Sequence, residues 1–111
     1  MSVKLTTREA GDVNLIDAAG RITLGEGSST FRDTLKDLTA KGQKKLLLNL
    51  AEVSYIDSSG IGELVSGYTT VSNAGGSLKL LNLTKRIHDL LQITKLYTIF
   101  EVFDDEAKGL A

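Results

Sequence analysis

The chain has 111 residues, 41% of them hydrophobic, which is enough apolar surface for one globular core. Thirteen Lys and Arg residues offset fourteen Asp and Glu residues, so charge alone would concentrate neither nucleic acid nor an anionic membrane on this chain. We therefore predict no nucleic-acid partner and no membrane partner. Cysteine is absent, and no apolar stretch has the length of a signal-peptide core or a transmembrane span, so we predict a cytoplasmic protein.

The first third of the chain has the pattern of a hairpin followed by a helix. Residues 3–7 and 13–18 alternate polar with apolar side chains and flank a Gly-Asp pair, which predicts a β-hairpin. Glycines interrupt the pattern within 20–27. Thr30 has an acidic residue three positions later, the spacing of a capping box, and predicts the start of a helix that ends at Gly42.

The middle of the chain has two strongly apolar segments and a helical stripe. The continuous apolar run over 45–50 predicts a strand covered on both faces and central in its sheet. From Ile61 to Val71, apolar residues recur at helical spacing and predict an amphipathic helix that ends at Gly75. A further strand is predicted over 78–83.

The last third predicts one more helix, one more strand and a short tail helix. Thr84 is placed to cap the helix, a last strand fits 98–102, and a weakly tethered helix fits 104–110. We therefore predict a single α/β domain over 1–111, with a mixed sheet of about five strands covered by about four helices. The sheet should be mostly parallel after the N-terminal hairpin.

The residues that enzymes use are poorly placed in this sequence. The only histidine, His88, lies in the polar part of a predicted helix, and Ile56 stands where a Gly-x-Ser-x-Gly elbow around Ser58 needs glycine. Gly60-Ile61-Gly62 could begin a dinucleotide fingerprint, but Val65 replaces its third glycine. We predict no enzyme, no catalytic residue, no cofactor and no metal site.

The run Asp57-Ser58-Ser59-Gly60 falls between a predicted strand and a predicted helix. Its Asp and Ser residues could simply cap the helix, since these are the commonest N-cap residues. Alternatively, Ser58 could carry a phosphate, which adds about −1.5 to −2 charge and is tolerated at a helix N-terminus. A partner packed on the unmodified turn would then meet a dianion, while Gly60 and Gly62 would leave room for that partner. The residue pattern leaves both interpretations open.

Three segments resemble the STAS family, particularly the bacterial anti-sigma factor antagonists: LNLAEVSYIDSSGIG over 48–62, GGSLKL over 75–80, and the stretch 87–100. The resemblance implies a STAS fold and a partner-switching cycle. In such a cycle the unphosphorylated protein binds a serine-kinase anti-sigma factor and so releases a sigma factor, which is only an indirect partner. The kinase then phosphorylates the antagonist, and a serine phosphatase resets it.

By the same resemblance, Ser58 matches the phosphoacceptor. The neighbours that match the partner-binding segment are Asp57, Ser59, Gly60, Ile61 and Gly62. The chain departs from the family at Arg21 and Thr23, where many members have acidic residues, and both positions belong to the expected partner surface. This departure leaves the identity of the kinase open. A STAS scaffold or transport-accessory subunit that acts on no sigma factor is the alternative.

Overall fold

The computed structural model describes residues 3–23 and 26–110, and its elements run in the order strand, strand, then alternating helices and strands. The strands are β1 (Val3–Ala10), β2 (Val13–Ile22), β3 (Lys45–Ile56), β4 (Ser77–Leu81) and β5 (Val102–Phe103). The helices are α1 (Glu26–Ala40), α2 (Ser58–Asn73), α3 (Lys85–Thr94) and α4 (Glu106–Leu110), with a 3₁₀ turn η1 (Leu96–Thr98).

All five strands form one mixed sheet in the order β1-β2-β3-β4-β5. β1 and β2 pair as an antiparallel hairpin, and the other neighbours are parallel. β3 is the middle strand, and Leu46, Leu47 and Leu48 are no more than 1% exposed. The predicted hairpin, the mixed sheet and the central apolar strand are confirmed.

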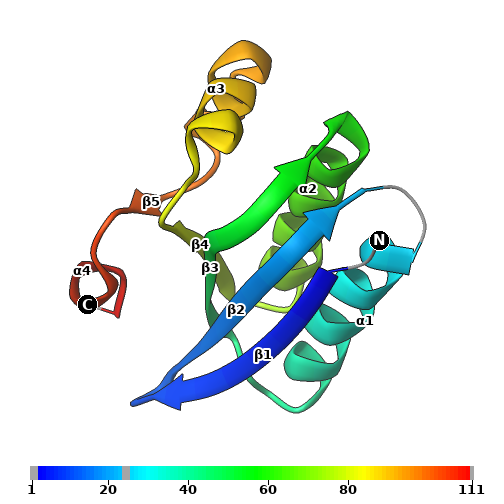
Figure 1. Cartoon of the computed structure of the whole chain (residues 1–111). Coiled ribbons are helices and arrows are strands. Elements are labelled where there is room, and N and C mark those ends of the chain that lie inside the picture. Colours follow the sequence, from blue (N-terminus) through cyan, green and yellow to red (C-terminus); the bar gives the residue numbers. More distant parts are fainter. Residues whose placement is uncertain (1–2, 24–25, 111) are drawn as a thin grey trace.

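The two faces of the sheet are covered unequally. α1 and α2 lie side by side on one face, over the main core, and α3 stands at the upper edge of the sheet (Figure 1). On the other face a smaller cluster of Val13, Leu15, Leu47 and Leu81 packs against partly buried residues that include Leu110 of α4. Because the parallel strands end together beside α3, the loops at that end are brought close to one another.

Helix α1 begins earlier than the capping-box spacing predicted. It starts at Glu26, and Thr30 lies inside it, where the Thr30 carbonyl accepts a hydrogen bond from the Thr34 hydroxyl at 2.9 Å. Asp33 is exposed, so its spacing from Thr30 reflects two polar positions on a helix surface rather than a cap. Gly27 is helical, since one glycine costs a helix only about 1 kcal/mol. The predicted break at Gly25 lies outside the described residues.

The predicted last strand over 98–102 is wrong. Thr98 belongs to η1, and β5 contains only Val102 and Phe103. Phe100, inside the predicted range, is buried without belonging to a strand, and its ring lies 5.4 Å from that of Tyr68. The preceding strand, β4, also ends earlier than predicted, at Leu81, because Asn82 adopts a left-handed backbone with φ of 57°.

The C-terminal helix forms as predicted, but it is better anchored than its few apolar residues suggested. Gly109 is buried, and a Cβ atom there would lie 2.8 Å from Cδ2 of Leu47. Glu106 accepts a hydrogen bond from Arg8 of β1 at 2.7 Å. The prediction of a weakly tethered tail is therefore wrong, because small and charged residues supply contacts that an apolar count misses.

Candidate functional site

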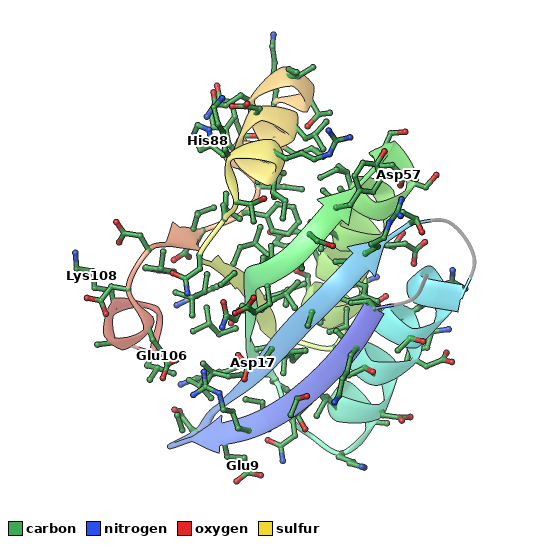
Figure 2. All side chains as sticks on the ribbon, in the orientation of Figure 1. Glu9, Asp17, Asp57, His88, Glu106 and Lys108 are labelled. Carbon is green, nitrogen blue, oxygen red and sulfur yellow. The ribbon has the colours of Figure 1, made fainter. Side chains whose placement is uncertain are left out.

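The Asp-Ser-Ser-Gly run lies where β3 ends and α2 begins. Ile56, the last residue of β3, is buried, and Asp57 connects it directly to the first helical residue, Ser58. Ser58 and Ser59 therefore lie in the first turn of α2 rather than in a loop before it. Figure 2 places Asp57 at the upper end of α2, close to where β2 and β3 end.

Asp57 is the N-cap of α2. Its Oδ1 accepts a hydrogen bond from the Gly60 backbone N–H at 2.8 Å, and its carbonyl accepts from Ile61 N–H at 3.0 Å. The capping role that the sequence left open among three residues thus belongs to Asp57. The side chain of Ser58 is exposed, and its hydroxyl makes no hydrogen bond with the residues that the structure describes.

The two glycines near the helix start have different roles. Gly60 is buried, and a Cβ atom there would overlap the carbonyl oxygen of Ile22 and lie 2.6 Å from Cγ1 of Ile56. Gly60 therefore lets α2 approach the end of β2, and it does not open the surface as the sequence suggested. Gly62 is exposed with nothing within 4 Å of such a Cβ atom, so it does leave the surface open. Ile61, predicted to bind a partner, is 4% exposed and belongs to the main core.

Arg21 and Thr23 lie beside this turn. Arg21 is paired in register with Tyr55, and Ile22 with Ile56, so the ends of β2 and β3 are adjacent. Thr23 is half-buried directly after β2. The sheet therefore brings Arg21 and Thr23 close to the turn that contains Ser58.

Sequence reasoning missed two residues at this end of the sheet, Tyr55 and Arg86. The Cζ atoms of Arg21 and Arg86 lie 4.8 Å and 4.4 Å from the centre of the Tyr55 ring. Arg86 also donates from Nε to the Ile56 carbonyl at 2.9 Å. No local signal in the sequence could have assigned Arg86 to this site, because nothing near it indicates that α3 returns to the end of β3.

The remaining charged groups near the site form ion pairs or lie in solvent. Arg32 of α1 bonds Glu63 of α2 at 3.3 Å and joins the two helices about one turn after Ser58 and Ser59. His88 is exposed on the side of α3 away from Asp57 (Figure 2), as predicted, with Nδ1 3.6 Å from Asp89. The Lys85 ammonium lowers the pKa of Asp89 below its usual value.

Residues 3–23 and 26–110 contain no group of three or more His, Cys, Asp or Glu side chains that could hold a metal ion. In the same part of the chain, every helix is too short or too polar to cross a membrane. The site is a surface turn whose Ser58 hydroxyl has no hydrogen bond to the described residues, and it follows a strand end, Tyr55-Ile56, that two arginines contact.

Comparison with known proteins identifies the family. Residues 4–109 match the STAS domain, so the chain belongs to the STAS domain family. It is 32% identical over 102 residues to the anti-sigma-B factor antagonist of Bacillus subtilis strain 168, an alignment that covers 92% of each chain.

Solved structures give the same fold. An anti-sigma factor antagonist from Mycobacterium paratuberculosis superposes with a TM-score of 0.84 at 16% identity, covering 98% of this chain and 92% of that one. The Bacillus cell fate determinant SpoIIAA in its phosphorylated form gives a TM-score of 0.74 at 16% identity, covering 96% of both chains. These likenesses confirm the STAS fold that the sequence resemblance implied.

Proposed function

We propose that this protein is an anti-sigma factor antagonist that binds a serine-kinase anti-sigma factor and is released when Ser58 is phosphorylated. The observation that carries the proposal is the exposed Ser58 hydroxyl at the first position of α2, left free because Asp57 fills the cap. Further support comes from the similarity to the Bacillus subtilis anti-sigma-B factor antagonist and to SpoIIAA, whose solved structure is of a phosphorylated form. The protein acts by binding, as a substrate of the kinase rather than as a catalyst.

The position of Ser58 suits a switch because a phosphate there should weaken partner binding without destabilising the fold. A phosphate there faces the free backbone N–H groups and the positive dipole end of α2, so the helix tolerates about −1.5 to −2 added charge. A partner that packs on the unmodified turn must instead desolvate a dianion that sits beside Asp57. Phosphorylation should therefore end binding without unfolding the protein.

The proposed phosphorylation cycle involves an anti-sigma factor, a serine phosphatase and a sigma factor, all in one cellular compartment. The anti-sigma factor binds directly and supplies the phosphate from ATP, a serine phosphatase removes it, and the sigma factor is affected only indirectly. Such a cycle would take place in the bacterial cytoplasm. Ser59, half-buried behind Ser58, and the open surface at Gly62 would form the edge of the contact.

The direct test is phosphorylation by the anti-sigma kinase encoded in the same genome. Mixing the two purified proteins with ATP should add one phosphate to the chain, and peptide mapping by mass spectrometry should place it on Ser58. Ser58→Ala should remain unmodified, whereas Ser66→Ala, which removes an exposed serine further along α2, is the matched control and should be modified normally. No phosphate in the presence of an active kinase, or a phosphate on Ser59, would refute the assignment.

A second test mimics the modified state. Ser58→Asp should weaken binding to the kinase by about tenfold or more, because the carboxylate must be desolvated at the interface. Its midpoint of urea unfolding should be unchanged or slightly higher, since an acidic residue in the first helical turn is worth about 0.3 to 1 kcal/mol. Titration calorimetry and circular dichroism measure the two effects. Binding equal to wild type would instead favour a STAS scaffold or transport-accessory role.

A further inference from the structure

Two arginines from distant parts of the sequence lie on one aromatic ring at the switch end of the sheet. Arg21 comes from β2 and Arg86 from α3, and both guanidinium groups lie within 5 Å of the centre of the Tyr55 ring. Both arginines are exposed, and Tyr55 is half-buried between neighbouring strands. Stacking on the ring restricts the long arginine side chains and holds their charges at the surface.

These two charges are not neutralised within the described part of the molecule. Arg8 and Arg32 each form ion pairs with carboxylates, but no carboxylate of a described residue lies within 4.0 Å of Arg21 or Arg86. Two like charges beside one ring repel each other, and an external anion relieves that repulsion. A planar guanidinium fork matches a carboxylate in particular, because it can donate two parallel hydrogen bonds.

The arginine pair adjoins the residue that carries the switch. Arg86 is bonded to the carbonyl of Ile56, two residues before Ser58, and Arg21 lies opposite Tyr55 on the neighbouring strand. A partner seated on the two guanidinium groups would therefore also cover the Ser58 turn. The surface is continuous with the interface of the proposed function rather than separate from it.

An apolar strip extends this surface along α3. Leu90 and Ile93 follow Arg86 at four and seven positions, which puts all three on one face of the helix. Ile93 is 78% exposed, more than any other large hydrophobic side chain that the structure describes, and a shallow depression runs between it and Arg86. The one acid in this depression, Asp89, is bonded to Lys85 at 3.0 Å, so it does little to oppose an incoming anion.

We propose that Arg21 and Arg86, ordered on Tyr55 and extended by Ile93, form a docking surface for a segment of the anti-sigma factor that carries carboxylates next to an apolar side chain. The carboxylates bind the guanidinium forks, and the apolar side chain covers Ile93. The inference rests on the proposed function, because it assigns the partner's chemistry at the same interface. It also gives the surface a selective role, since a partner with a basic segment is repelled.

Charge reversal tests the assignment. Arg21→Glu and Arg86→Glu should each weaken binding of unphosphorylated protein to the purified anti-sigma kinase by about tenfold, chiefly through slower association, and salt should weaken the wild-type complex. Arg86→Lys should lose less affinity, because it keeps the charge while losing the planar fork. Lys36→Glu, on the exposed face of α1, is the matched charge control and should bind like wild type. Thermal unfolding of each variant identifies any loss caused by misfolding.

The outcomes separate this inference from the proposed function. If wild type is phosphorylated on Ser58 but both charge reversals bind within about twofold of wild type, the docking surface is wrong and the switch stands. Tighter binding after charge reversal would mean a basic partner segment and would also overturn the inference. So would a wild-type dimer that Arg86→Glu dissociates, since the surface would then belong to a second copy. If wild type neither binds nor is phosphorylated, the proposed function itself fails.

Discussion

At the scale of single residues, Gly60 is under a tighter steric constraint than the neighbouring Ser58 or Ser59. A methyl group at Gly60 would overlap the Ile22 carbonyl oxygen and press on Ile56, both parts of the sheet rather than mobile side-chain ends. Gly60→Ala should therefore lower the free energy of unfolding by about 1 to 3 kcal/mol, the usual cost of overpacking. Gly62→Ala is the matched control and should raise stability by up to about 1 kcal/mol, because alanine is the better helix former in open space. Urea unfolding measures both.

The Gly60→Ala and Gly62→Ala variants also distinguish a packing role from a partner-binding role for these two glycines. If Gly60→Ala is as stable as wild type, the close contact between α2 and β2 is not rigid, and Gly60 could belong to the partner surface as the sequence suggested. If Gly62→Ala keeps its stability but binds the anti-sigma factor less well, Gly62 lies at the interface. The structure predicts that Gly60→Ala is less stable than wild type and that Gly62→Ala is at least as stable.

At the scale of elements, α2 depends on one side chain for its start. Asp57 accepts the Gly60 N–H at 2.8 Å, so Asp57→Ala should destabilise the protein by about 0.5 to 2 kcal/mol. Asp57→Asn keeps an acceptor of the same shape and should lose little. Ser58→Ala should change stability less than Asp57→Ala, because the Ser58 hydroxyl is not part of the cap. An Asn variant as unstable as the Ala variant would mean that charge, rather than the cap hydrogen bond, holds the turn.

The helices and strands show which features of this protein could be predicted from its sequence. β3 was predicted from a continuous apolar run and α2 from the helical spacing of its apolar residues, and both patterns report burial directly. The contact of Arg86 with Ile56 spans 30 positions, and no local period encodes it. β5 was misplaced for a related reason, since the burial of Phe100 against Tyr68 imitates the apolar signal of a strand. The strand-to-helix turn that contains Ser58 was therefore predictable, whereas the cationic surface near it depends on tertiary packing.

At the scale of the whole molecule, the C-terminal helix is fastened to the hairpin, far from the turn that contains Asp57 and Ser58. Figure 2 shows Asp17 and Glu106 far from Asp57. Arg8 bonds both carboxylates, each at 2.7 Å, and thereby joins α4 to the hairpin. This fastening holds α4 over the second apolar cluster, which would otherwise face solvent.

The stability that the Arg8 ion pairs give to the docking of α4 should be lost at low pH. Arg8 lowers the pKa of Asp17 and of Glu106, and it does so mainly through its hydrogen bonds to them. A depressed carboxyl pKa contributes stability that is present above the unfolded-state value of about 4 and is lost as pH falls through the lower folded-state value. We expect the Leu110 methyl signals, followed by NMR from about pH 7 to about pH 2, to shift toward solvent-exposed positions only below about pH 4. In Arg8→Ala the shift should already be present near neutral pH, because α4 has lost its ionic contact. If both proteins give the same titration curve, apolar packing alone holds the helix and the ion pairs add nothing.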